Sequence, residues 1–114
     1  MIWYLRQTSF IWHTSVKKVL GTGWGNGYVA VPPTHPAYKK DYGTFSIASL
    51  SSNIHGGITY TGFGNGVDAP QDWWVLGFDT GHLDDNIEKW PKEAVEAETK
   101  RLFCQLLDIE LGGL

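Results

Sequence analysis

The chain of 114 residues lacks the features that mark several large protein classes. Cys104 is its only cysteine, so it forms no intramolecular disulfide and no cysteine-clustered zinc site. It has no run near the roughly 18 apolar residues of a membrane span, and its start lacks the pattern of a signal peptide. With a net charge of −3, it offers no electrostatic reason to bind duplex nucleic acid. We therefore expect a soluble, cytoplasmic protein without a membrane partner.

Several catalytic motifs are also missing. The chain has no Gly-x-Ser-x-Gly elbow, no His-Glu-x-x-His helix, no phosphate loop and no dinucleotide-binding glycine pattern. Its single His-x-Ser/Thr-like unit, His13-Thr14-Ser15, falls short of the pair that a two-histidine phosphoesterase requires. These absences exclude serine hydrolases with that elbow, zinc proteases with that helix, two-histidine phosphoesterases, and the phosphate-loop and dinucleotide-binding motifs.

Aromatic residues and glycines are what the chain has in abundance. It contains fourteen Gly, six Trp, five Tyr and five Phe, and 42% of its residues are hydrophobic. This composition predicts one domain, residues 1–114, with tight turns between aromatic strands. Segments enriched in aromatic and β-branched residues predict strands at Ile2–Arg6, Ser9–Thr14, Val16–Leu20, Tyr28–Val31, Ile58–Thr61 and Trp73–Phe78.

The C-terminal segment 91–107 has the pattern of an amphipathic helix. Pro91 suits a first helical position, and Val95, Leu102 and Leu106 mark one apolar face. Cys104 is expected at the edge of that face as a small buried side chain. Because the strands precede the helix without βαβ alternation, we expect an α+β fold, a mainly antiparallel sheet with the helix packed on one face.

A short pattern occurs twice, as Gly23-Trp24-Gly25-Asn26-Gly27 and as Gly62-Phe63-Gly64-Asn65-Gly66. Asn-Gly favours the type I′ turn of a β-hairpin, so each copy is most simply a hairpin end. A pair of aromatic-tipped loops around a ligand is the alternative.

The strongest cluster of chemically active residues follows the apolar strand that begins at Trp73 and Trp74. Asp79, His82 and Asp85 come directly after this strand and offer the oxygen and nitrogen donors that bind Zn²⁺, Mn²⁺ or Fe²⁺. We therefore predict these three residues as candidate metal ligands. The simpler alternative is that the aspartates cap turns and His82 donates to a carbonyl.

Two further histidines are candidate site residues. His55 precedes Gly56 and Gly57, which let a ligand approach the backbone and could present amide donors to an anion. A β-bulge with a solvated histidine is the alternative. His35 lies on the rigid proline-rich loop, and we expect it at the rim of a cavity shared by His55, Asp79 and His82.

In order along the chain, these blocks read Gly-Tyr-Val-x-Val-Pro with His35-Pro36, then His55-Gly56-Gly57-x-Thr59-Tyr60, then Trp73-Trp74 with Gly-Phe-Asp79-x-x-His82-x-x-Asp85. The order resembles a family of small proteins of bacteriophages, prophages and bacteria. The resemblance covers about residues 27–85 and implies His35, His55, Asp79, His82 and Asp85 as site residues. It also implies the host cytoplasm as the location if a phage encodes the chain.

Three function classes stay open. In the first, a phage-type accessory protein binds a small polar, nucleotide-like ligand, such as a host defence signal, in a pocket lined by Tyr60, Trp73 and Trp74. In the second, His55, Asp79 and His82 form the catalytic centre of a metal-assisted or acid–base hydrolase. In the third, the acidic C-terminal part contacts a host protein. Six tryptophans exceed what one core needs, so some are expected at a cleft or an interface, which leaves a homo-oligomer open.

Overall fold

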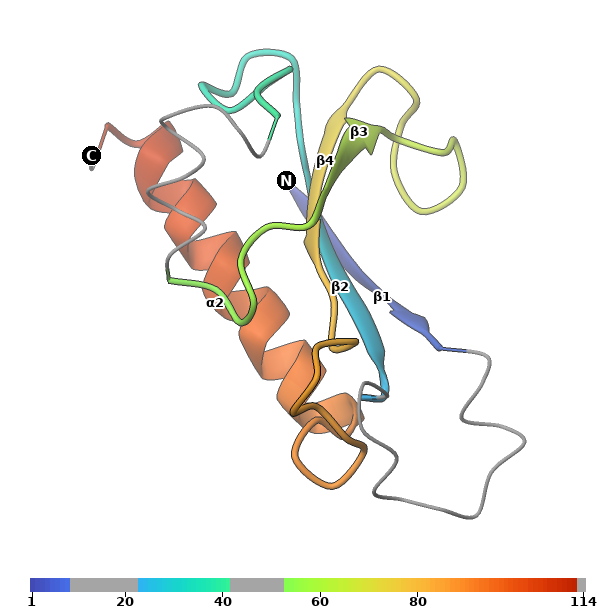
Figure 1. Cartoon of the computed structure of the whole chain (residues 1–114). Helices are drawn as coiled ribbons and strands as arrows, with labels where there is room; N and C mark the ends of the chain where they lie inside the picture. The colour runs from blue at the N-terminus through green and yellow to red at the C-terminus, as the bar shows by residue number, and fades with distance from the viewer. Residues whose placement is uncertain (9–22, 42–52, 113–114) are drawn as a thin grey trace.

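Four antiparallel strands form one sheet with a long helix packed against it (Figure 1). The computed structural model describes residues 1–8, 23–41 and 53–112. The elements are β1 (Ile2–Gln7), β2 (Gly25–Val31), β3 (Tyr60–Phe63), β4 (Trp74–Phe78) and α2 (Lys92–Glu110). The order across the sheet is β1-β2-β4-β3, and every neighbouring pair is antiparallel. The predicted α+β class is therefore confirmed.

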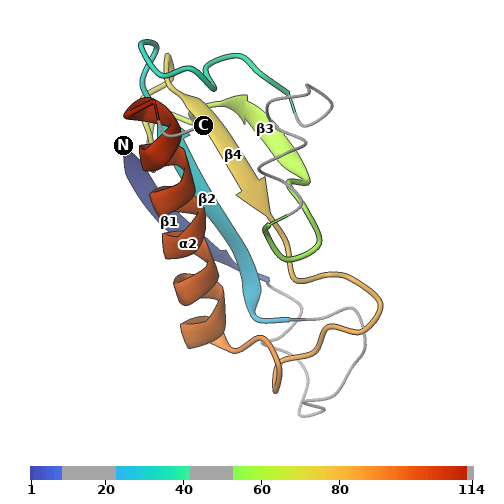
Figure 2. The same cartoon turned by 90° about the vertical axis from the view of Figure 1, so that its left-hand side faces the viewer.

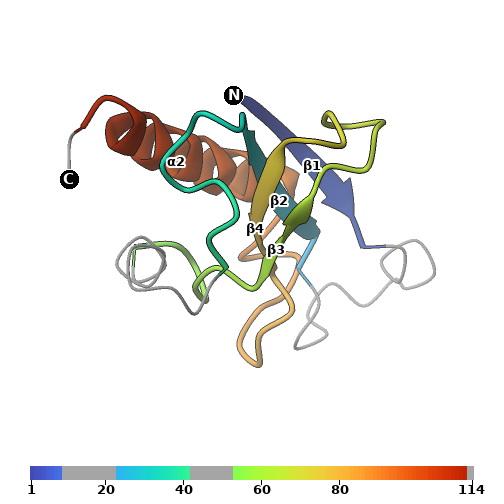
Figure 3. The same cartoon turned by 90° about the horizontal axis from the view of Figure 1, so that it is seen from above.

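The core lies between the sheet and the helix. Side chains alternate along each strand, so those of Val29, Val31, Leu76 and Phe78 all face α2 and are buried. They pack against the buried helix residues Val95, Leu102 and Leu106. Figure 2 shows α2 running over β1 and β2, and Figure 3 shows that none of the described residues forms a helix on the opposite face of the sheet.

Four of the predicted strands fall in the described part of the chain. The strands at Ile2–Arg6, Tyr28–Val31 and Trp73–Phe78 are present with shifts of one to three residues at their ends. The strand predicted at Ile58–Thr61 begins two residues later, at Tyr60, because Gly56 and Gly57 adopt positive φ and keep the chain in a turn. The predictions at Ser9–Thr14 and Val16–Leu20 lie outside the described residues.

The first glycine-rich pattern is not a hairpin end, which corrects that prediction. Gly25 and Gly27 lie inside β2, paired with β1. A Cβ on Gly25 would lie 2.2 Å from the carbonyl oxygen of Arg6, so this glycine permits close approach of β1. The second pattern does end β3. Gly64 donates to the carbonyl of Trp73, and Gly66 turns the chain with φ +80°.

The helix α2 begins near the predicted residue and continues three residues beyond the predicted end, to Glu110. Cys104 is exposed, so the prediction that it is a buried side chain is wrong. Its position on the helix turns it away from the face that holds Val95, Leu102 and Leu106. In the described part of the chain, no helix has both the length and the apolar character needed to cross a bilayer.

Candidate functional site

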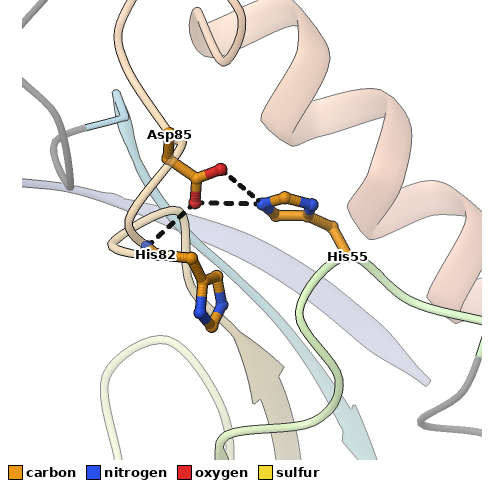
Figure 4. A group of neighbouring side chains, drawn as sticks. All are labelled: His55, His82 and Asp85. Carbon is orange, nitrogen blue, oxygen red and sulfur yellow. Dashed lines mark hydrogen bonds and ion pairs between the residues drawn. The ribbon is translucent and has the colours of Figure 1, made fainter.

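Three side chains from two loops meet beside α2. His55 comes from the loop before β3, and His82 and Asp85 come from the loop after β4 (Figure 4). One ligand atom from each of the three lies within 4.8 Å of those of the other two. The loops meet because β3 and β4 are antiparallel neighbours, so the chain entering β3 and the chain leaving β4 lie at the same end of the sheet.

Asp85 is at the centre of this group. Its side chain is only 5% exposed, and its two carboxylate oxygens lie 2.8 and 3.0 Å from Nε2 of His55. The backbone N–H of His82 donates to Oδ2 at 3.0 Å. A carboxylate removed from water in this way needs such donors or a cation to offset its lost hydration. Asp85 thus fixes both histidines, one through its ring and one through its backbone.

His55 is held from three directions. Its Nε2 contacts Asp85, its backbone N–H donates to Oε2 of Glu98 at 2.8 Å, and its ring lies against the ring of Trp90 with the centroids 4.1 Å apart. Glu98 is buried on α2 and also accepts from Nη1 of Arg101. When Nε2 carries the proton that Asp85 accepts, Nδ1 presents a lone pair. The ring is therefore preorganised by neighbours that cannot easily move.

His82 contributes the least satisfied polar atom of the group. Its Nε2 is buried and has no hydrogen-bond partner among the described residues. Oδ1 of Asp79 lies 3.1 Å away, close enough for an ion pair, although this contact lacks hydrogen-bond geometry. Gly56, with φ +66°, passes over the same nitrogen, and a Cβ at that position would lie 2.0 Å from Nε2. A buried nitrogen without a partner is costly, so its presence needs an explanation.

A divalent cation is one species that this arrangement can hold. Two imidazoles and one carboxylate form a common ligand set for catalytic zinc and also occur with iron and manganese. An ion between these residues would be bound by the unpartnered nitrogen of His82 and would balance the negative charge of Asp85. Asp85 with His55 could alternatively act as an acid–base pair, in which the carboxylate orients the imidazole.

The set that the structure brings together differs by one residue from the set predicted as metal ligands. His55 joins His82 and Asp85, while Asp79 lies outside the group, where its Oδ1 accepts from the backbone N–H of Gly81 at 3.0 Å and lies 3.1 Å from Nε2 of His82. The amide of Gly57 donates to the carbonyl of Ile54, so it cannot serve the anion-binding role that we predicted for it. Gly56 instead makes room for the ring of His82.

His35 does not lie at the rim of this site, which corrects the expected geometry. Its ring is buried against the other end of α2, where Nε2 lies 2.8 Å from the carbonyl of Leu106 and Nδ1 accepts from the N–H of Ala37. Leu106 is eight residues beyond Glu98, or about 12 Å along the helix axis. Nε2 thus attaches the proline-rich loop to the helix, and Nδ1 stabilises the turn within that loop.

The predicted aromatic pocket residues are also separated from the histidines. Trp74 packs against the helix-covered core and Trp73 against the opposite face of the sheet, as their adjacent positions predict. Both lie at the start of β4, whereas His82 and Asp85 follow its end. Tyr60 lies on the open face of the sheet, beside Tyr28. The aromatic residues and the histidines therefore do not line one common pocket.

Trp90 and Glu98 are site residues that the sequence prediction missed. Glu98 carried a signal, because it lies three residues after Val95 and four before Leu102, a spacing that puts a carboxylate on the apolar face of the helix. Trp90 carried no comparable signal, since the turn that brings it onto His55 depends on its backbone bonds to Asn86 and Trp24.

Comparisons with protein-family models, with curated proteins and with solved structures found no match to this chain. The resemblance to small phage and bacterial proteins therefore stays an interpretation of the sequence blocks.

Proposed function

We propose that this protein is a metal-dependent hydrolase in which His55, His82 and Asp85 bind one divalent ion, with zinc the best match. The observation that carries the proposal is the unpartnered, buried Nε2 of His82 beside the His55–Asp85 pair. Three protein ligands leave one position of a tetrahedral zinc open to water, which is the pattern of catalytic rather than structural zinc.

The chemistry follows from the ligand set and its surroundings. If these three residues held zinc, the ion would supply Lewis-acid chemistry, lowering the pKa of a bound water to about 7 for attack on an ester or phosphoester. Oδ1 of Asp79, 3.1 Å from Nε2 of His82, would place a further negative charge beside the ion. Glu98 fixes the backbone of His55 by accepting its N–H. Trp90 shields one face of the His55 ring from water.

Zinc titration of the purified protein tests the metal part of the proposal. Trp90 lies against His55, so zinc binding is expected to change tryptophan fluorescence, with a stoichiometry of one ion per chain by calorimetry. Asp85→Asn should abolish the saturable change. Asp84→Asn is the matched control, because it removes the neighbouring, exposed carboxylate that lies outside the group and should leave zinc binding intact.

Hydrolysis is then measured on chromogenic nitrophenyl esters and phosphoesters with zinc, manganese or iron present. We expect turnover of at least one of these substrates by the wild-type protein and by Asp84→Asn, and none by Asp85→Asn or His82→Ala. Wild-type protein that binds no zinc would refute the metal site. Zinc binding without turnover of any ester or phosphoester would refute the hydrolase.

A further inference from the structure

The face of the sheet that α2 leaves open carries a row of aromatic residues. Tyr4, Tyr28, Gly77 and Tyr60 occupy one register across all four strands, in the order β1, β2, β4 and β3. Gly77 supplies no side chain to the row, and the ring of Tyr28 lies over it, since a Cβ there would be 2.5 Å from Cδ1 of that ring. The glycine thus lets an aromatic ring lie flat on the sheet.

The rings around this row enclose a hollow. Tyr4 and Tyr28 stack with centroids 5.0 Å apart, and Tyr60 meets Tyr28 edge-on at 5.8 Å. The hollow has a volume of ≈ 290 Å³ and is lined by Tyr4, Arg6, Tyr28, Tyr60, Phe63 and Asn65. Tyr60 is 45% exposed, so a large part of its ring contributes nothing to the core, whereas the ring of Phe63 packs edge-on against Trp74 with the centroids 5.2 Å apart. Exposed aromatic surface grouped in this way is typical of a binding site.

Polar groups lie at the rim of the hollow. Arg6 is exposed, and its Nη2 lies 3.1 Å from Oδ2 of Asp68. Asn65 donates to the same carboxylate oxygen at 2.9 Å. An exposed ion pair of this kind contributes about 0–1 kcal/mol, so an incoming anion can replace Asp68 as the partner of Arg6 at little cost. Burial and the nearby charge of Asp68 raise the pKa of Tyr4 to about 12, so its hydroxyl stays protonated well into the alkaline range.

We propose that this hollow binds a mononucleotide, with the base stacked on the exposed ring of Tyr60 and the phosphate bound by Arg6. Base–aromatic stacking suits any planar heterocycle, and a guanidinium suits a phosphate. The volume gives room for one base, and the net charge of −3 disfavours a longer polyanion. The site is separate from the His55–His82–Asp85 group, and it does not depend on the proposed hydrolase.

Calorimetry and two-dimensional NMR with AMP, adenosine and ribose 5-phosphate test each half of the site. AMP should bind more tightly than adenosine, and ribose 5-phosphate should not bind. Tyr60→Ala should weaken AMP binding by about tenfold or more, as expected when a stacking ring is lost, whereas Tyr60→Phe should keep most of the affinity. Arg6→Gln should reduce the affinity for AMP to that for adenosine. Leu83→Ala, an exposed side chain outside the hollow, is the control and should leave AMP binding unchanged.

Four results would overturn the proposal. The first is the absence of AMP binding, and the second is AMP binding that Tyr60→Ala does not weaken. The third is equal affinity for AMP and adenosine in the wild-type protein, which would remove the role of Arg6. The fourth is tighter binding of a single-stranded oligonucleotide than of AMP, which would assign the face to a polynucleotide. Circular dichroism of Tyr60→Ala, compared with Tyr60→Phe, separates lost binding from lost folding.

Discussion

Replacing Gly56 with alanine should damage the candidate metal site in a way that the structure makes measurable. Gly56 has φ +66°, and an added Cβ would lie 2.0 Å from Nε2 and 2.5 Å from Cδ2 of His82. Real Cβ atoms essentially never lie within 3.0 Å of such atoms, so something must shift. Because Nε2 and Cδ2 belong to one rigid ring, the whole ring has to move. The His82 ring must therefore leave the position in which it lies beside Asp85 and His55.

The expected cost has two parts. An L-residue in the left-handed region costs about 1–2 kcal/mol more than glycine. Forcing a packed side chain aside adds about 1–3 kcal/mol. Gly66→Ala isolates the first part, because Gly66 has φ +80° and its added Cβ would meet only the flexible side chain of Gln71, at 3.1 Å. We expect Gly56→Ala to lower the free energy of unfolding by about 2–5 kcal/mol and Gly66→Ala by about 1–2 kcal/mol.

Urea denaturation of both variants measures these costs, and a zinc titration of the folded proteins measures the effect on the site. Zinc affinity should fall by about tenfold or more in Gly56→Ala, in line with the loss of a ligand or of its support, and should not change in Gly66→Ala. Equal losses of unfolding free energy, together with equal zinc affinities, would refute the idea that Gly56 exists to accommodate the His82 ring.

Two further predictions concern Glu98 and Tyr4. Glu98→Ala should weaken zinc binding by about 10- to 100-fold because the backbone of His55 loses its acceptor. Glu98→Gln, whose amide oxygen can accept the same N–H, should recover most of that affinity in the same titration; equally weak binding by both variants would contradict a positioning role. For Tyr4, the pKa is raised from 10.0 to about 12 in the folded protein, so the unfolded chain loses this proton first as pH rises. The stability that it contributes should be complete below pH 10 and lost between pH 10 and 12, and Tyr4→Phe should lack this decline when unfolding is followed by circular dichroism; an identical decline in both proteins would contradict it.

The arrangement of strands and helix could be predicted because its signals are local. The aromatic and β-branched residues of Ile2–Arg6 indicate a strand, and Val95, Leu102 and Leu106, spaced by seven and four residues, indicate a helix and the face that it buries. The first glycine-rich pattern misled for a physical reason. An Asn-Gly pair can form a hairpin turn or lie within a strand where the glycine permits close packing, and the sequence alone does not distinguish the two. Gly27 permits close packing, because a Cβ there would meet Phe78 and Thr99.

The candidate site was predicted in part because two of its three residues are close in sequence. His82 and Asp85 lie three residues apart in one loop, so their proximity follows from local geometry. The hydrogen bond from the backbone N–H of His82 to Oδ2 of Asp85 closes that loop. His55 is thirty residues from Asp85, and its place depends on the antiparallel pairing of β3 with β4. Asp79, although nearer in sequence, lies 3.1 Å from Nε2 of His82 but is not one of the three residues whose ligand atoms all lie within 4.8 Å of one another.

His35 shows why a histidine beside a proline-rich turn was a weaker candidate than its sequence context indicated. Both of its ring nitrogens contact backbone atoms, Leu106 on α2 and Ala37 in its own loop. A buried imidazole satisfied on both sides joins a loop to a helix and has no lone pair left for a ligand. At His82 the same side chain has a buried nitrogen for which the described chain supplies no hydrogen-bond partner. The difference between these two histidines lies in tertiary contacts alone, and it is the reason for placing a cation at His82 and not at His35.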